Sequence, residues 1–252
     1  MRTVCSMRIA LISDIHGNLK ALEAVLAELK HSSVGNIVCL GDVAATGPEP
    51  HETVQQLKNL SVPVVMGNKD QLLLGEIAPR KNLQDEDMRR INEIDLWCAA
   101  QLTTDDKEYM KSFEKIVAVP LGNGNNLLCF HGSPASNVDL ITSKTSDEEV
   151  HRMLAGSDAP TMAGGHSHVQ MLRQLGSIRL INPGSVGQAI ERVPGSSMVR
   201  HLPWAEYAIV ESDAGFPSKV QFFRKKYDRT ELHSIARSSG MPHSEWWATR
   251  AG

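Results

Sequence analysis

Short apolar runs alternate with amphipathic segments over the first 67 residues of the chain. Three runs have the apolar, partly β-branched character of buried strands, at residues 8–13, 36–41 and 62–67. The two segments between them, residues 18–30 and 51–60, have the periodicity of helices. This strand–helix–strand–helix–strand order predicts parallel strands joined by right-handed crossovers.

The pattern changes after the third run. Residues 71–113 are dominated by helical patterns, which predicts a helical insertion. An Asn123-Gly124 pair then separates two short apolar runs, as in a β-hairpin. A capping box at Ser146 predicts a helix to about Leu154. Late apolar runs indicate a second sheet, with strands at residues 161–164, 177–181, 206–212 and 219–227.

The composition indicates the class of protein and the number of domains. The chain has 252 residues, of which 41% are hydrophobic and 22% charged, as in ordinary globular proteins. No repeat or Pro/Ser-rich linker divides it. We therefore expect a single α/β domain over residues 1–252, with a loose C-terminal tail after about residue 234.

The net charge and the cysteines indicate which partners and which cellular compartment to expect. The net charge of −3 gives no strong nucleic-acid signal. The four cysteines include no CxxC pair, which favours buried, reduced thiols. The first apolar run, Ile9 to Ile12, is too short for a signal-peptide core or a membrane span. These features predict a cytoplasmic protein without a membrane partner; translation from Met1 or from Met7 and the oligomeric state stay open.

Five of the predicted strands are followed, within two residues, by Asp, Asn or His. In open α/β sheets, ligands bind outside the carboxyl ends of the strands, so these side chains are expected to meet at one edge. The residues placed in this way are Asp14, His16, Asp42, Asn68, His131, His166 and His168.

This set offers three oxygen donors and four imidazoles. Seven ligands exceed what one transition metal binds, and they suit two metal ions that share a carboxylate. In an extended chain residues i and i+2 point the same way, so Asp14 with His16, and His166 with His168, are each expected to present two ligands to one side. A set without thiolates favours manganese, with iron, zinc, cobalt or nickel as other candidates.

Each residue also has an ordinary interpretation. Asp14 suits a helix cap, Asp42 and Asn68 suit turns, and His131 suits a satisfied position in the core. The two histidines at residues 165–168 are by themselves compatible with the surface. The placement of all of them at strand ends favours the metal site.

The motifs resemble those of the calcineurin-like metallophosphoesterases, whose pattern is D-x-H, G-D, G-N-H-[DE], an isolated His and G-H-x-H. The same order occurs here over about residues 8–225 as Asp14-Ile15-His16, Gly41-Asp42, Gly67-Asn68-Lys69-Asp70, His131 and Gly165-His166-Ser167-His168. The stretches GDVAATGP and NPGSVG, residues 41–48 and 182–187, resemble the small bacterial and archaeal phosphodiesterase branch.

This resemblance implies a four-layer αββα sandwich with two mixed β-sheets and a metal site at the C-terminal ends of the strands. It also assigns ligands. One metal would be held by Asp14, His16 and His168, a second by Asn68, His131 and His166, and Asp42 would bridge them. The implied reaction is in-line attack of a metal-bridged hydroxide on a phosphodiester or phosphomonoester, with Asp42 and Asn68 in the catalytic set.

Two departures from the family pattern bear on mechanism. Lys69 replaces the family histidine that assists the leaving group; we expect it to contact substrate phosphate or to donate weakly to the leaving oxygen, with a solvent-facing lysine as the alternative. In GDVAATGP the Asp and Arg of the protein phosphatases are absent, which disfavours a protein phosphatase and favours phosphodiesters. The remaining candidates for contact with substrate are Asn18, which also suits a helix cap, and Arg80, Arg89 and Arg90, which also suit a solvated face.

The expected function is therefore a dinuclear metal-dependent phosphoesterase with a small phosphoester substrate. The alternative is a non-catalytic scaffold of the same fold that binds proteins. Such scaffolds usually lack some of the ligands, whereas all seven are present here.

Overall fold

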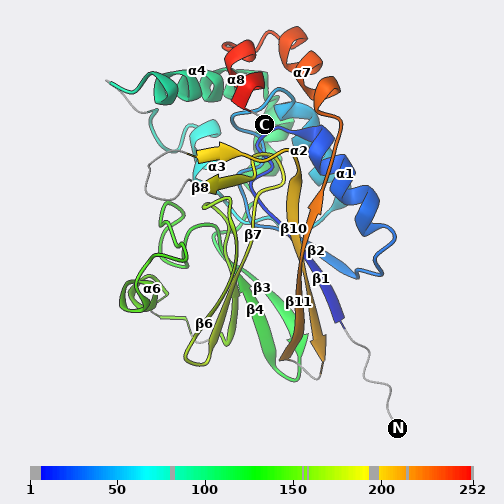
Figure 1. The fold of residues 1–252 in the computed structure, drawn as a ribbon, viewed down its shortest axis with the longest axis vertical. Coiled ribbons are helices and arrows are strands. Elements are labelled where there is room, and N and C mark those ends of the chain that lie inside the picture. Colours follow the sequence, from blue (N-terminus) through cyan, green and yellow to red (C-terminus); the bar gives the residue numbers. More distant parts are fainter. Residues whose placement is uncertain are drawn as a thin grey trace.

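The computed structural model describes residues 7–79, 83–154, 156–157, 159–192, 199–213 and 216–250 (Figure 1). The helices are α1 (Leu19–Leu29), α2 (Pro50–Leu60), α3 (Asn68–Leu73), α4 (Glu86–Gln101), α5 (Thr104–Met110), α6 (Asp147–Met153), α7 (Arg229–Ser238) and α8 (Ser244–Arg250). The strands are β1 (Met7–Ile12), β2 (Asn36–Cys39), β3 (Val117–Gly122), β4 (Asn125–Cys129), β5 (Thr161–Ala163), β6 (Gln170–Leu175), β7 (Ile178–Pro183), β8 (Ile190–Arg192), β9 (Val199–His201), β10 (Ala205–Asp213) and β11 (Phe216–Lys225).

Two mixed sheets form the centre of the fold. The first has the order β11-β10-β1-β2, in which β1 and β2 are parallel and the other neighbours antiparallel. The second has the order β3-β4-β5-β7-β6, with β4, β5 and β7 parallel. A short pair, β8 and β9, stands apart from both.

Alternate side chains of β1 face opposite sides of its sheet, and both sides are covered. Ile9 and Leu11 pack into a cluster between the two sheets, whereas Ala10 and Ile12 face the cluster that α1 and α2 cover. A third cluster packs α6 against the outer face of the second sheet. Figure 1 shows this order, helices, sheet, sheet and helix. The α/β sandwich with two mixed sheets is thus confirmed.

One predicted strand is wrong. Residues 62–67 run beside β2 but form only two isolated bridges, Cys39 with Val64 and Val65 with Glu114. Val64 and Val65 are buried, which accounts for the apolar character of the segment. A buried segment does not need continuous hydrogen bonding to a neighbouring strand, so the apolar pattern did not guarantee a strand.

The late strands divide between the sheets instead of forming one. The strand predicted at residues 177–181 corresponds to β7 (Ile178–Pro183), which lies in the second sheet. In contrast, β10 returns to pair antiparallel with β1 and brings β11 with it. The strands β6, β8 and β9 were not anticipated. The hairpin was, and Asn123 and Gly124 both have positive φ, as a tight turn between β3 and β4 requires.

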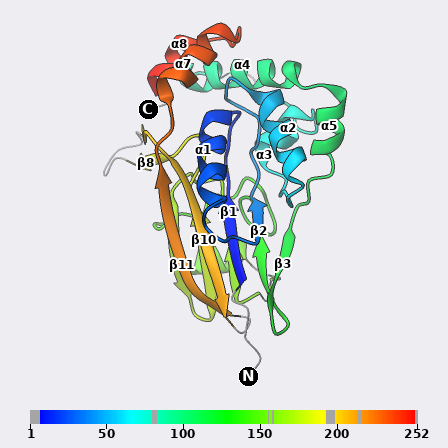
Figure 2. The same ribbon diagram turned by 90° about the vertical axis from the view of Figure 1, so that its right-hand side faces the viewer.

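Helices α4 and α5 occupy much of the segment from residue 71 to 113, where helical patterns dominate the sequence. The expectation of a loose tail after residue 234 is wrong: α7 runs to Ser238 and α8 follows it. Trp247 on α8 is only 4% exposed, and its indole Nε1 donates to the carbonyl of Thr46 at 2.7 Å. Figure 2 shows α4, α7 and α8 together at one end of the sheets.

The remaining compositional expectations concern thiols and membranes. Cys39, Cys98 and Cys129 are buried free thiols, and Cys5 lies outside the described residues. Burial raises the pKa of Cys98 to about 12, so its thiol is inert at neutral pH. None of the helices in the described part of the chain is long and apolar enough to span a membrane.

Candidate metal centre

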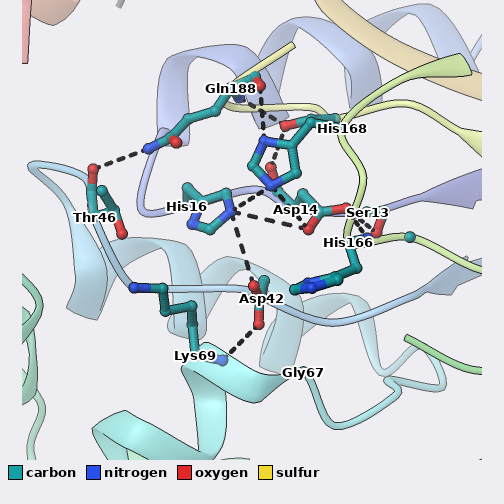
Figure 3. Close-up of polar contacts among 12 residues, drawn as sticks. Ser13, Asp14, His16, Asp42, Thr46, Gly67, Lys69, His166, His168 and Gln188 are labelled. Atoms are coloured by element: carbon teal, nitrogen blue, oxygen red, sulfur yellow. Dashed lines mark hydrogen bonds and ion pairs between the residues drawn. The ribbon is translucent and has the colours of Figure 1, made fainter. Parts of the chain in front are cut away.

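The predicted ligands come together at one edge of the sheets. Figure 3 labels five of them, Asp14, His16, Asp42, His166 and His168. Asp14 and Asp42 follow β1 and β2, Asn68 begins α3, His131 follows β4, and the last two histidines follow β5. We call the seven predicted ligands the ligand rim: Asp14, His16, Asp42, Asn68, His131, His166 and His168. Asp14, His16, Asp42 and His131 are buried, whereas Asn68, His166 and His168 are partly exposed.

The backbone of the rim differs from the expected extended chain. Five of its residues have positive φ, between 51° and 65°: Asp14, His16, Asp42, His166 and His168. Such left-handed backbone costs on the order of 1–3 kcal/mol per non-glycine residue and tends to occur at functional sites. The spacing of two residues does bring ligands together, but through strained loops and not through strand alternation.

One group of possible ligands joins Asp14, His16 and His168. Asp14 Oδ1 lies 3.2 Å from His168 Nε2 and 3.9 Å from His16 Nε2. The two Nε2 atoms are 3.1 Å apart.

The other group joins Asp42, His131 and His166. Asp42 Oδ2 lies 3.4 Å from His131 Nε2, and Asn68 Oδ1 lies 3.1 Å from the same nitrogen. Asp42 Oδ2 is also 4.0 Å from His16 Nε2, a member of the first group. The Asp42 carboxylate therefore lies between the two groups, and His166 and His168 belong to different groups.

Backbone carbonyls set the tautomers of three rim histidines. The Nδ1 atoms of His16, His131 and His168 donate to the carbonyls of Ala45, Leu40 and Gln188 at 3.1, 2.8 and 2.9 Å. A neutral imidazole with hydrogen on Nδ1 offers the lone pair of Nε2, and such an outer hydrogen bond is typical of metal-ligating histidine.

Two further features fit a cation in the first group. Two Nε2 lone pairs that face each other at 3.1 Å repel unless a cation or proton lies against both. Asp14 Oδ1 is buried and has no hydrogen-bond partner among the described residues, although buried carboxylate oxygens are normally satisfied. The donors present therefore fit two divalent ions.

The electrostatics of the rim keep its carboxylates ionised. Burial by itself raises the pKa of Asp14, but the neighbouring His168 outweighs it and lowers that pKa to about 2. The pKa of Asp42 lies below its ordinary value because His131 outweighs burial in the same way. Burial and the charge of His168 lower the pKa of His16 to about 4. Asp42 in turn raises the pKa of His131 to about 10 against the effect of burial, and Asp14 raises the pKa of His168. The two carboxylates are therefore ionised and hold positive charge on their neighbours, which is the charge that bound metal ions would supply.

Asp70 supports the rim, although the sequence analysis gave it no role. Its buried carboxylate accepts from the backbone N–H groups of Asp42, Val43 and Gly67 at 2.8, 2.9 and 3.0 Å. It thereby fixes the loop that carries Asp42. The signal was the acidic residue at the last position of the Gly67-Asn68-Lys69-Asp70 motif.

Lys69 is not a solvent-facing lysine. Its ammonium pairs with Asp95 of α4, a side chain 1% exposed, which also accepts from Thr46 Oγ1 at 2.6 Å. The backbone N–H of Lys69 donates to Asp42 Oδ1 at 2.8 Å. The role of Asp95 was missed because an acidic residue within a helix of mixed charge carries no distinguishing pattern.

The substrate-binding role expected of Asn18 is wrong. Its side chain is fully buried and caps α1 by accepting from the N–H of Ala21 at 3.1 Å. Its amide nitrogen donates to the carbonyl of Gly187 at 3.1 Å and to the hydroxyl of Tyr227 at 3.2 Å. No group of Asn18 is left for a substrate, and Asn18 rather than Asp14 is the helix cap.

The two described arginines of the helical segment, Arg89 and Arg90, do not reach the ligand rim. Arg89 pairs with Glu86 on the surface of α4. Arg90 pairs with the same carboxylate at 3.2 Å and lies over the ring of Trp246 at 5.4 Å. Arg80 lies outside the described residues. The described arginines thus form a surface network.

Comparison with known proteins agrees with this geometry. A family model, the calcineurin-like phosphoesterase superfamily domain, matches residues 7–203. The match spans most of the chain, and the chain belongs to this superfamily.

Relatives with similar sequences cover different shares of the chain. An uncharacterised protein of Methanocaldococcus jannaschii is 27% identical, with 96% of each chain covered. A symmetrical bis(5'-nucleosyl)-tetraphosphatase of Pectobacterium atrosepticum is also 27% identical, but over 60% of this chain and 52% of its own. A crystal structure of a metallophosphoesterase from Sphaerobacter thermophilus is 28% identical, covers 97% of this chain and 98% of its own, and has a TM-score of 0.71.

Proposed function

We propose that this protein is a dinuclear metal-dependent phosphoesterase, with manganese as the first candidate metal and iron, zinc, cobalt or nickel as alternatives. The observation that carries the proposal is the position of Asp42 between two groups of donors, each with two buried members and one partly exposed histidine. Two divalent ions at such a site supply a water nucleophile at neutral pH and stabilise charge on the phosphoryl oxygens. The presence of all seven ligands favours this enzyme over the protein-binding scaffold.

The side chains of the protein orient the reaction. The Nδ1 hydrogen bonds of three rim histidines hold their rings in place. Asp70 holds the loop that carries Asp42. The main chain of Lys69 donates to Asp42, and its ammonium pairs with Asp95. These contacts support the proposal that Lys69 contacts substrate phosphate or donates weakly to the leaving oxygen.

The surroundings of the rim favour a phosphodiester over a phosphomonoester. A monoester carries more negative charge and gains more from an arginine clamp. Thr46 stands where the protein phosphatases have their arginine, and its hydroxyl donates a hydrogen bond to Asp95. We therefore propose a small phosphodiester substrate in the cytoplasm, and we include a bis(5'-nucleosyl) tetraphosphate in the substrate panel because one relative carries that name.

The test is hydrolysis of bis-p-nitrophenyl phosphate by protein that is stripped of metal and reloaded with Mn²⁺. We expect activity only with metal, and at least about a 1000-fold lower kcat/KM for Asp42→Asn, because this isosteric change removes the shared charge. Asp213→Asn, at the exposed end of β10, is the matched control and is expected to keep full activity.

Metal content measured on the same samples separates the alternatives. Two Mn²⁺ per chain with no hydrolysis of any diester or monoester in the panel would favour the scaffold. Activity in Asp42→Asn equal to that of the parent would overturn the proposed site.

A further inference from the structure

The ligand rim opens onto a cavity of about 480 Å³. This volume lies within the range of small-molecule sites. Five rim residues line one part of the cavity: His16, Asp42, Asn68, His166 and His168. Most of the remaining lining comes from the segment between α3 and α4 and from α4 itself.

Seven of the twelve remaining lining residues are apolar, and six of these have large side chains. We call these six large apolar side chains the apolar wall: Leu72, Ile77, Leu83, Met88, Ile91 and Val138. Three of them are among the seven large hydrophobic side chains that are exposed in the described part of the chain. Ile77, Met88 and Val138 are 40%, 37% and 59% exposed.

Core packing does not explain this exposure. A buried apolar side chain stabilises the fold in proportion to the area removed from water, and these three leave a large part of theirs in water. They come from two separate segments, the region 77–88 and the loop after β4, yet they gather at one cavity. Exposed apolar side chains that gather beside a polar site mark a binding surface.

We infer that the apolar wall holds the organic group of the substrate. The substrate class is then a phosphoester with an alkyl or aryl group attached to the phosphate that lies at the ligand rim. This inference rests on the proposed function, because the rim must bind the phosphate for the wall to meet the organic group. Among the described lining residues Lys69 is the one lysine or arginine, and its ammonium is paired with Asp95.

The wall is tested by binding, with alkylphosphonates as probes. Each phosphonate carries one organic group and is not hydrolysed as an ester, so its orientation is unambiguous. Isothermal titration of the Mn²⁺-loaded protein compares methylphosphonate with hexylphosphonate. We expect at least about tenfold tighter binding of the hexyl compound and a more negative heat-capacity change, the signature of apolar burial.

The variant Met88→Ser/Val138→Ser changes two exposed wall residues, and its Tm checks that it folds. We expect the preference for the hexyl compound to fall below about threefold, with unchanged affinity for methylphosphonate. Leu96→Ser is the matched control, because Leu96 is 47% exposed on the same helix but does not line the cavity. It is expected to keep the full preference.

The outcomes separate the two claims. Equal affinity of the parent for both phosphonates, or a preference that survives in the double variant, overturns the apolar wall while leaving the phosphoesterase intact. A protein that binds neither phosphonate and hydrolyses no phosphoester with Mn²⁺ contradicts the proposed function itself.

Discussion

Hydrogen bonds hold the ligand rim, whereas the apolar wall across the same cavity is held by packing and leaves several side chains half in water. Rim histidines are oriented by carbonyls, and Asp70 uses three backbone N–H groups to fix one loop. The wall has no comparable polar network among its described side chains. Phosphoryl chemistry needs atoms fixed to fractions of an ångström, while an apolar contact tolerates changes of shape.

The largest effect on stability is expected from a change that crowds the rim without replacing any of its ligands. In Gly67→Ala, the new Cβ would lie 2.1 Å from Asp42 Oδ1 and 2.4 Å from Asp42 N. The backbone of Gly67 suits any residue, with φ −81° and ψ 166°, so the effect is purely steric. We expect a loss of about 3 kcal/mol in the free energy of unfolding and weaker Mn²⁺ binding, measured by urea denaturation and metal titration.

Gly35→Ala is the control for this variant, because its nearest neighbour is Arg8 O at 3.9 Å. It is expected to change neither quantity. If Gly67→Ala binds Mn²⁺ as tightly as the parent, the rim is not as rigid as its hydrogen bonds indicate.

A smaller effect on stability is expected from His201, which lies next to the apolar wall. His201 lines a small cavity together with Ile91, a residue of the wall. Burial, with a further contribution from the charge of Arg250, lowers the pKa of His201 to about 4. Neither ring nitrogen has a hydrogen-bond partner among the described residues.

The sign of the pH dependence follows from that lowered pKa. As pH falls from 6.5 towards 4, the unfolded chain binds a proton that the folded protein does not, so stability is lost over this window. Allowing for partial exposure, we expect His201 to account for about 2 kcal/mol of this loss. Urea denaturation at pH 7.5 and pH 4.5 should show a smaller difference for His201→Leu than for the parent; an equal difference would mean that His201 is solvated.

The smallest effect is expected where the two sides of the cavity meet, at the pair of Lys69 and Asp95. Asp95→Asn removes the charge that positions the Lys69 ammonium. We expect about a fivefold lower kcat/KM for bis-p-nitrophenyl phosphate, or about 1 kcal/mol, with unchanged Mn²⁺ content.

A double-mutant cycle with Lys69→Ala distinguishes positioning from a general loss of stability. If Asp95 acts through Lys69, Asp95→Asn has no effect on kcat/KM once Lys69 is absent. Additive losses would show that Asp95 acts independently of the lysine.

Several elements were predictable because their information is local. The periodicity of residues 18–30 predicted α1, and Asn123-Gly124 predicted the hairpin of β3 and β4. The rim residues were predictable as a set because six of them follow strands whose ends meet, and Asn68 follows an apolar segment that runs beside β2 without forming a full strand.

Other features depend on contacts between distant residues. Whether residues 62–67 form a strand depends on continuous pairing with a neighbour, and only two bridges form. Trp247 is buried because it meets Thr46, about 200 positions earlier in the chain, so nothing near residue 234 indicated an ordered end. Asn18 had two local interpretations, and burial against Gly187 and Tyr227 decided between them.

By itself, the sequence determined the kinds of donor and their attachment to strand ends, because both follow from residue identity and short-range pattern. The family resemblance already implied that the donors divide into two groups with Asp42 between them, and the same grouping is present in the structure. Only the tertiary structure decided which carbonyls orient the rim histidines, how strained their loops are, and which carboxylate holds Lys69. The physical reason is that hydrogen-bond partners, burial and strained backbone arise where separate segments meet. The apolar wall has the same origin, since Met88 and Val138 share a cavity only after folding.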